Sequence, residues 1–304
     1  MANQRQIGET YNYMDEIFRM SFGENADITG AMYNGDFSKS LEQAQSEKHK
    51  YILNALNVQE SSTLLDIGCG WGPLLMKAKE RKANGIGLTL STKQADSCKA
   101  HELQVYVKDW KEISSDPTVE KFEAIASVGS FEHFCSIEEY LANQQEDIYK
   151  KFFKFCYDRL QSGGRLFLQT MMWGRNAPSY EEISLKAKWG SNEYLVAVLE
   201  KFYPGSWLPY GQEQIVKIAA PYFKVVSLNN GRKDYIQTMN EWNKRLNSPS
   251  FKKLIKVFSL IPYFLKDKSF RYKIESLIFL KGYNRECFIR EIMDHQRIVF
   301  ERLS

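Results

Sequence analysis

The middle of the chain alternates short apolar runs with longer stretches in which apolar residues recur every three or four positions. Such alternation is typical of an α/β fold, in which helices connect parallel strands. The predicted strands are Thr63–Ile67, Gly85–Leu90, Gln104–Lys108, Ala124–Val128, Arg165–Thr170, Phe223–Leu228 and Arg297–Arg302. The helices predicted between them include Pro73–Lys82, Ser91–Glu102 and Ile137–Leu160.

No internal repeat and no linker-like tract divides the 304 residues, so we expect a single domain over 1–304. Its parts are predicted as a helical N-terminal cap (1–60), a central core (61–173), two helical lid segments (174–220 and 240–292) and two terminal strands (223–228 and 297–302).

Charge is spread unevenly along the chain. The net charge of +4 is too small to indicate nucleic-acid binding by itself. Residues 243–304 hold 14 Lys and Arg against 6 Asp and Glu, a net charge of +8, which leaves −4 for the rest. Within them, Phe251–Leu265 is both cationic and apolar. It is either a helix packed on the core, or a lid or a peripheral contact with an anionic lipid surface.

Cysteine usage and hydropathy bear on the compartment. The 5 cysteines are scattered without a Cys-x-x-Cys pair, which predicts neither a disulfide framework nor a metal site. The first residues lack the apolar core of a secretory signal, and no run is apolar enough to span a membrane. We therefore expect a reduced, cytoplasmic protein, with its oligomeric state left open.

The most informative motif is Leu64–Gly72, LLDIGCGWG, where a predicted strand enters a glycine-dense turn. Gly68, Gly70 and Gly72 allow the backbone to turn sharply and to approach a ligand that a Cβ would exclude. Asp66 can orient the turn or bind the ligand. The G-x-G-x-G spacing differs from the G-x-G-x-x-G of dinucleotide folds. We therefore predict a nucleoside site that is not a nicotinamide site; a purely structural turn is the alternative.

Three further strings follow in order: GIGLTLSTKQ at 85–94, SVGSFEHF at 127–134 and FYPGSWLP at 202–209. With the glycine turn, they resemble the class I S-adenosylmethionine-dependent methyltransferases, in particular the branch of cyclopropane fatty acid and mycolic acid cyclopropane synthases. The resemblance covers roughly residues 28–242. It implies a Rossmann-like seven-stranded sheet with helices on both faces and S-adenosyl-L-methionine as cofactor. It also implies methyl transfer to C, N or O of a small or lipid-like hydrophobic acceptor.

The resemblance also implies which residues hold the cofactor. In that branch a threonine and a glutamine replace the usual acidic ribose ligand, which points to Thr89 and Gln94. Ser91 and Gln94 also form a helix-capping pair, and both readings can hold. Trp110 is implied to lie against the adenine and Asp109 to reach its amine, with plain core packing as the alternative for Trp110. The remaining implied contacts are Tyr33, Asp66, Gly68, Gly70, Gly72, Leu90 and Val128.

The implied catalytic residues are Glu132, Tyr235 and Tyr33. Glu132 belongs to the E-H-F string, whose glutamate lines the active site in the resembling branch. A buried carboxylate stabilises positive charge on an acceptor or accepts its proton. His133 is equally compatible with a structural role.

Two departures from the branch affect the predicted chemistry. Cyclopropane synthases share a Y-S-C string near the N-terminus and a histidine ending the fifth strand. With the glutamate and a tyrosine, these residues hold a bicarbonate thought to act as base. This chain has Met32–Phe37, MYNGDF, and Gln169 instead. We therefore favour simple methylation over ring closure. The alternatives are a cyclopropane synthase for unsaturated acyl chains, with Asn34 and Gln169 binding another base, and a non-catalytic cofactor-binding partner protein.

The aromatic-rich segment Trp189–Tyr210 is predicted either to form the acceptor pocket or to fill the interface between insertion and sheet. Trp207 is a candidate for stabilising a cation there. Nucleic-acid substrates are disfavoured, because the chain outside 243–304 carries net negative charge and no basic stripe.

Overall fold

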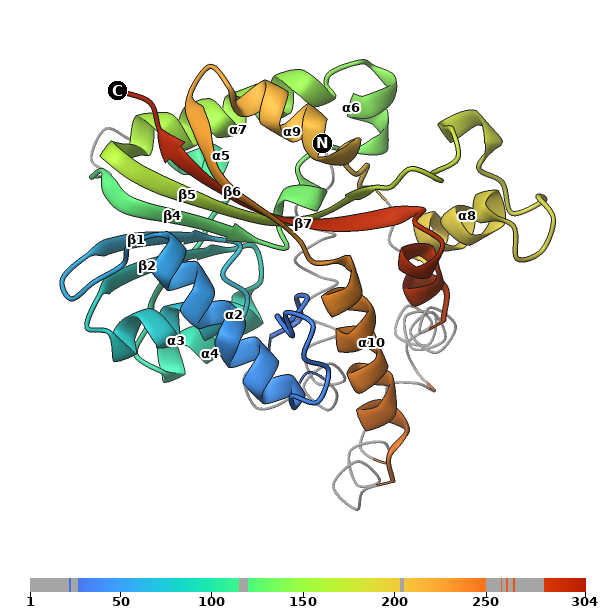
Figure 1. Cartoon of the computed structure of the whole chain (residues 1–304), viewed down its shortest axis with the longest axis horizontal. Helices are drawn as coiled ribbons and strands as arrows, with labels where there is room; N and C mark the ends of the chain where they lie inside the picture. The colour runs from blue at the N-terminus through green and yellow to red at the C-terminus, as the bar shows by residue number, and fades with distance from the viewer. Residues whose placement is uncertain are drawn as a thin grey trace.

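The computed structural model describes residues 22, 27–114, 120–202, 205–249, 258, 261, 265 and 282–304. Their strands form one seven-stranded sheet in the order β3-β2-β1-β4-β5-β7-β6 (Figure 1). The strands are β1 Thr63–Ile67, β2 Asn84–Thr89, β3 Gln104–Val107, β4 Phe122–Val128, β5 Leu160–Trp173, β6 Phe223–Asn230 and β7 Met293–Arg302. β1 to β5 pair in parallel, whereas β7 runs antiparallel to β5 and to β6. The predicted Rossmann-like α/β sheet is confirmed.

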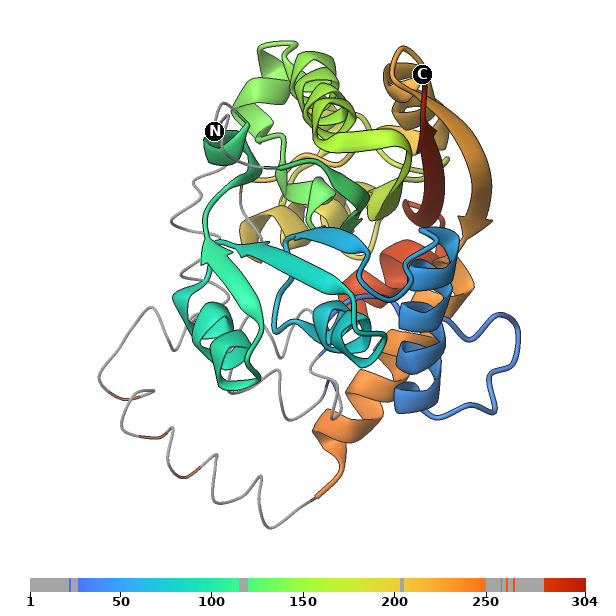
Figure 2. The same ribbon diagram turned by 90° about the vertical axis from the view of Figure 1, so that its left-hand side faces the viewer.

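Helices cover both faces of this sheet (Figures 1 and 2). One face carries α2 (Leu41–Ala55), α3 (Pro73–Glu80) and α4 (Thr92–Ala100); the other carries α5 (Trp110–Ile113), α7 (Gln145–Arg159) and α9 (Gly211–Ala219). Phe152 and Phe153 of α7 are fully buried in the larger core cluster, to which Ile215 of α9 also belongs. Burying this apolar surface is the main stabilising contribution to such a layered fold.

The N-terminal cap is less helical than predicted. Among the described residues before β1, only α2 is an α-helix, and 27–40 are irregular. Asn34 and Gly35 take left-handed φ values of 53° and 82°, which a helix does not allow. The prediction of helix there was therefore wrong for 27–40.

The predicted helix Ile137–Leu160 is interrupted. It divides into α6 (Ile137–Leu141) and α7 because Asn143 takes a left-handed φ of 56°. The amide of Gln144 then donates to the carbonyl of Glu139 and ends the first helix.

The predicted lid segments also differ from the structure. Within 174–220 the helices are η2 (Tyr180–Glu182), α8 (Asn192–Phe202) and α9. α9 belongs to the core, not to a lid, because its apolar face is buried against α7. The second segment begins with α10 (Arg232–Asn247), ahead of the predicted residue 240, and residues 282–289 are also helical.

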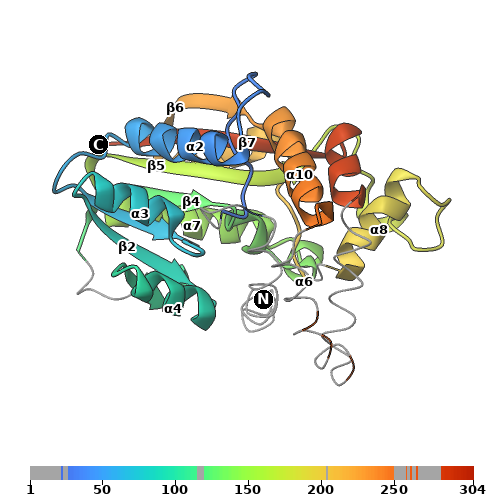
Figure 3. The same ribbon diagram turned by 90° about the horizontal axis from the view of Figure 1, so that it is seen from below.

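α8, α10 and helix 282–289 gather beyond the end of β5 (Figure 3). The basic apolar stretch 251–265 lies outside the described residues except Phe258, Ile261 and Leu265, which are exposed. In the part of the chain that is described, no helix is long and apolar enough to cross a membrane.

Candidate active site

The glycine turn begins where β1 ends and is held by the neighbouring strand. The amides of Gly68 and Cys69 both donate to the carbonyl of Leu88, each at 2.9 Å. Gly68 has φ 79°, and a Cβ there would lie 2.5 Å from the Cβ of Ser130. Gly70 also has positive φ, but a Cβ there would meet open space. The glycines therefore both pack the turn closely and leave its outer side accessible.

A cavity that is partly open to solvent lies over this turn at the carboxyl ends of β1, β2 and β4. This is the edge at which open α/β sheets bind ligands. Of the predicted cofactor residues, those that line it are Asp66, Gly68, Gly70, Thr89, Leu90, Gln94, Asp109, Trp110 and Val128. Gly72 does not line it, because it packs the turn against Leu103 and Cys98.

The polar wall at the end of β2 is built from Thr89 and Gln94. The hydroxyl of Thr89 donates to Oε1 of Gln94 at 2.7 Å. Ser91 begins α4, and its Oγ accepts from the amide of Gln94 at 3.2 Å. The helix cap and the cavity wall therefore use the same residues, as the sequence allowed.

Trp110 forms part of both the core and the cavity wall. Its ring packs against Phe134 and Phe152, with centroid distances of 5.6 and 5.5 Å. Its buried Nε1 has no hydrogen-bond partner within the described chain. Asp109 caps α5, its Oδ1 accepting from the amide of Lys111 at 2.8 Å.

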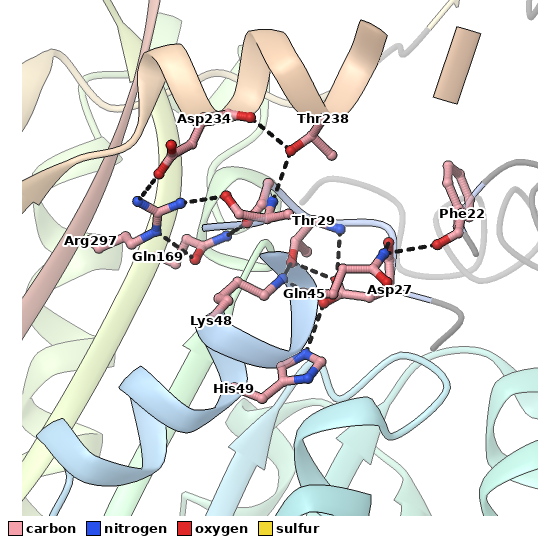
Figure 4. Close-up of polar contacts among 12 residues, drawn as sticks. Phe22, Asp27, Thr29, Gln45, Lys48, His49, Gln169, Asp234, Thr238 and Arg297 are labelled. Carbon is pink, nitrogen blue, oxygen red and sulfur yellow. Dashed lines mark hydrogen bonds and ion pairs between the residues drawn. The ribbon is translucent and has the colours of Figure 1, made fainter. Parts of the chain in front are cut away.

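The cavity-lining residues that the sequence analysis missed include the polar group Asp27, Thr29, Lys48 and His49. The side chains of Lys48 and His49 reach up from α2 to the carboxylate of Asp27, with Nζ–Oδ2 and Nε2–Oδ2 distances of 2.6 and 2.8 Å (Figure 4). Burial alone would raise the pKa of Asp27, but these two partners outweigh it and hold the pKa well below its usual range.

A signal for these residues does exist in the sequence. Lys48 and His49 lie among the buried positions of α2, which repeat at helical spacing and are otherwise mostly apolar (Leu41, Ala44, Gln45, Ile52 and Leu53). Polar residues at core positions of a helix need a buried partner. The sequence does not show which one, because Asp27 lies in an irregular segment.

We expect Lys48→Met to lower the free energy of unfolding by about 3–5 kcal/mol, because it leaves Asp27 buried without its main counter-charge. Urea denaturation at pH 7 measures this. The exposed Lys50 on the same helix is the matched control, and Lys50→Met should change stability by less than about 0.5 kcal/mol. Asp27→Asn combined with Lys48→Met should recover part of the loss. A loss below about 1 kcal/mol for Lys48→Met contradicts the assignment.

Asp66 lies under the turn and is buried. Burial raises its pKa to about 7, the charge of Asp27 adds to this, and Lys48 opposes it. The carboxyl of Asp66 therefore titrates near neutral pH in the ligand-free protein.

Glu132 lies directly behind the cavity wall. Its carboxylate accepts from the hydroxyl of Thr170 at 3.0 Å and from the amide of Met171. Burial raises its pKa to about 7. It does not itself line the cavity, but its Oε1 is 3.7 Å from the point where a Cβ on the lining residue Gly129 would lie.

His133, the next residue of the string, faces the cavity. Its Nδ1 is 3.0 Å from Oγ of Ser206, in the segment that follows α8. Burial lowers its pKa to about 4, so the imidazole is neutral at physiological pH.

Comparison with known proteins identifies the family. The sequence profile described as mycolic acid cyclopropane synthetase matches residues 1–263. The chain belongs to this family.

The S-adenosylmethionine-dependent methyltransferase UmaA of Mycobacterium tuberculosis is 32% identical over 248 residues, 78% of this chain and 80% of that protein. Cyclopropane mycolic acid synthase 2 of Mycobacterium leprae is 29% identical over 245 residues, 78% of each chain. The crystal structure of mycolic acid cyclopropane synthase CmaA1 complexed with SAH and CTAB superposes with a TM-score of 0.77. It has 23% identity and covers 98% of both chains. The resemblance to the cyclopropane synthase-like branch is confirmed.

Tyr33, which was expected to contact the cofactor, does not line the cavity. Tyr33 is fully buried among Ala31, Leu41 and Ala44, and its hydroxyl has no partner in the described residues. Thr29, four residues earlier, lines the cavity instead. The expectation for Tyr33 as a cofactor contact and catalytic residue therefore does not fit the structure, in which its ring is packed in that cluster and does not line the cavity.

Gln169 and Asn34, the residues at the two departures, are both held by neighbours. Gln169 donates to the carbonyl of Gly30 at 3.2 Å and accepts from Arg297 at 3.3 Å. Arg297 is completely buried, pairs with Asp234 at 2.9 Å and donates to the carbonyl of Ala31 (Figure 4). The amide of Asn34 donates to Asp234.

Tyr235 and Trp207 belong to an aromatic cluster beyond β5, which also contains Trp173, Met239, Phe288 and Met293. Trp207 stacks on Tyr140 at 4.7 Å and donates to the hydroxyl of Tyr210. Trp207 therefore fills the interface between insertion and sheet. Tyr235 packs edge-on against Phe288 and does not line the cavity.

Proposed function

We propose that this protein transfers the methyl group of S-adenosylmethionine to a hydrophobic, lipid-like acceptor and stops at methylation without closing a ring. Its family and its 32% identity to an S-adenosylmethionine-dependent methyltransferase carry the reaction class and the cofactor. The observation that carries the proposal is the cavity over the glycine turn, with the carboxylate of Glu132 just behind its wall.

The cavity fits the cofactor. At Gly70 the absence of a side chain leaves open space for a ligand. Trp110 offers a broad ring, and its Nε1 has no hydrogen-bond partner among the described residues. The hydroxyl and amide of Thr89 and Gln94 can satisfy ribose hydroxyls. Asp66, Asp109, Leu90 and Val128 complete the proposed binding residues. When bound there, the cofactor supplies an electrophilic methyl group.

Two groups of the E-H-F string have complementary properties for this reaction. Glu132 is held by Thr170 and by the amide of Met171, so its carboxylate is oriented before an acceptor arrives. It can stabilise positive charge or accept a proton. His133 is neutral and faces the cavity, so it can orient an acceptor atom or receive its proton.

The aromatic cluster supports a hydrophobic acceptor. Met171 packs against this cluster through its side chain while its amide donates to Glu132. Met171 therefore contacts both the aromatic cluster and the carboxylate of Glu132. Sites for lipid-like molecules are built mostly from apolar side chains with a few polar groups. We propose that Tyr235, which is packed within this cluster, lies next to the acceptor.

The hydrogen bonds of Gln169 favour methylation over ring closure. Gln169 cannot serve as the base that ring closure requires, because an amide is not basic. Both ends of the Gln169 amide are already occupied, by Gly30 and Arg297. Gln169 is therefore an oriented, neutral hydrogen-bonding group at this position and supplies no base of its own.

The test is incubation with S-adenosylmethionine carrying a labelled methyl group and a panel of unsaturated acyl lipids, prenyl compounds and small amines. We expect label in a lipid-like product, and mass spectrometry after catalytic hydrogenation to show a methyl branch without a ring. A ring in the product overturns the second part of the proposal. Cofactor binding without labelled product from any acceptor overturns the first part.

A further inference from the structure

A loop on the insertion after β5, residues 183–190, exposes large apolar side chains. Trp189 is 76% exposed, more than any other large hydrophobic residue described, and Leu185 is 50% exposed. The loop projects beyond the end of the sheet next to α8 in two perpendicular views (Figures 1 and 3). We call this segment the Trp189 loop.

The Trp189 loop is held in shape by its own hydrogen bonds. The amide of Ala187 donates to the carbonyl of Ser184, and that of Ser191 donates to the carbonyl of Lys188. Arg290 anchors the end of the loop by donating to the carbonyl of Gly190 at 2.7 Å. The indole is therefore presented to solvent by a defined turn.

The base of the loop joins the aromatic cluster. Tyr180 and Ile183 pack against this cluster, and Tyr180 lies 5.3 Å from the ring of Trp207. One short segment therefore connects the exposed Trp189 to the aromatic cluster.

Two lysines flank the exposed apolar residues. Lys186 and Lys188 are exposed, and neither has an acidic partner within the described part of the chain. Of the two glutamates at the base of the loop, Glu182 accepts hydrogen bonds from Ser179. Tryptophan beside lysine is the composition found where proteins enter the headgroup region of a bilayer.

We propose that the Trp189 loop docks this protein on an anionic lipid bilayer, with Trp189 and Leu185 inserted among the headgroups and Lys186 and Lys188 facing their phosphates. This deepens the proposed function, since docking brings the aromatic cluster next to a membrane from which a lipid acceptor can enter. An exposed indole flanked by two cations without an acidic partner in the described residues favours an anionic bilayer as the occupant, because the indole suits the headgroup region and the lysines suit its phosphates.

The test is co-sedimentation of the full chain with vesicles of phosphatidylcholine and phosphatidylglycerol, and with phosphatidylcholine alone. We expect Trp189→Ala to weaken partitioning roughly tenfold or more. Lys186→Gln with Lys188→Gln should remove the preference for the anionic vesicles. Leu185→Ala should weaken partitioning as well. Leu228→Ala, which changes a leucine of similar exposure (46%) on the edge strand β6, is its matched control and should bind as the parent does.

Vesicle binding does not depend on the acceptor, so this proposal and the proposed function can fail separately. Equal partitioning of the parent, Trp189→Ala and Leu228→Ala overturns docking by the loop, and so does a parent that does not sediment with either vesicle. If Trp189→Ala loses vesicle binding but methylates a detergent-dispersed acceptor like the parent, the loop acts in docking alone. Retained vesicle binding without methyl transfer to any acceptor overturns the proposed function and leaves the docking proposal supported.

Discussion

Glu132→Gln is expected to slow methyl transfer at least ~100-fold while changing cofactor affinity less than about threefold. The carboxylate lies behind Gly129 and is oriented by Thr170, so a glutamine can keep the same hydrogen-bond acceptor but loses the charge and the basicity. Single-turnover transfer and calorimetric titration with the cofactor measure the two quantities. Glu123→Gln, at the opposite end of β4, should leave both unchanged.

The same substitution should raise stability above neutral pH. In the unfolded chain Glu132 has the ordinary glutamate pKa of 4.5, whereas in the folded protein its pKa is about 7. The folded protein therefore holds an extra proton between these values, and stability falls as pH rises through this window. At pH 8 the penalty is roughly 3 kcal/mol, which Glu132→Gln removes. Asp66 titrates in the same window, so part of the pH dependence remains.

Denaturation at pH 5 and pH 8 tests this relation. The variant should gain stability over the parent at pH 8 and little at pH 5. Undiminished transfer by Glu132→Gln excludes a catalytic carboxylate. An equal stability difference at both pH values excludes a buried group that titrates near neutrality.

Gly68→Ala is expected to weaken cofactor binding by at least ~100-fold. An alanine at φ 79° is strained by about 1–2 kcal/mol, and its Cβ would lie 2.5 Å from that of Ser130. Ser130 cannot withdraw freely, because its hydroxyl donates to the carbonyl of Ile67 at 2.9 Å. The turn must shift instead, and displacements near 1 Å at a binding site cost about two orders of magnitude.

Gly163→Ala is the control that separates backbone strain from the steric clash with Ser130. Gly163 has φ 73°, but a Cβ there meets no atom within 4 Å. It should lose stability by about 1–2 kcal/mol and bind the cofactor like the parent. Calorimetry with S-adenosylhomocysteine and thermal unfolding measure both variants. If Gly68→Ala binds as tightly as Gly163→Ala, the turn does not hold the cofactor.

Most of the sheet could be predicted because its signals are local. Thr63–Ile67 is apolar and is followed at once by glycines, so the boundaries of β1 could be read directly from the sequence. The break between α6 and α7 could not be predicted. It depends on a left-handed Asn143, and the flanking residues continue the helical apolar pattern across it.

Residues far apart in the chain were harder to place. Lys48 lies in α2, and Asp27 lies in the irregular segment before it. Their ion pair forms because the fold buries both side chains together. Arg297 and Asp234 are likewise 63 residues apart, and their contact depends on the antiparallel pairing of β7 with β6, the strand that precedes α10. The burial of a charged side chain cannot be predicted from its residue type, because such residues are usually exposed.

The α/β class, the glycine turn and several of the residues that line the cavity could be inferred from the sequence alone, because strand, turn and helix N-terminus are set by neighbouring residues. Only the tertiary structure decided that Thr29 and not Tyr33 reaches the cavity, that Trp207 is packed away in a ring cluster, and that His133 faces inward beside the buried Glu132. Those outcomes depend on which surfaces are buried together, and that is a property of the whole fold.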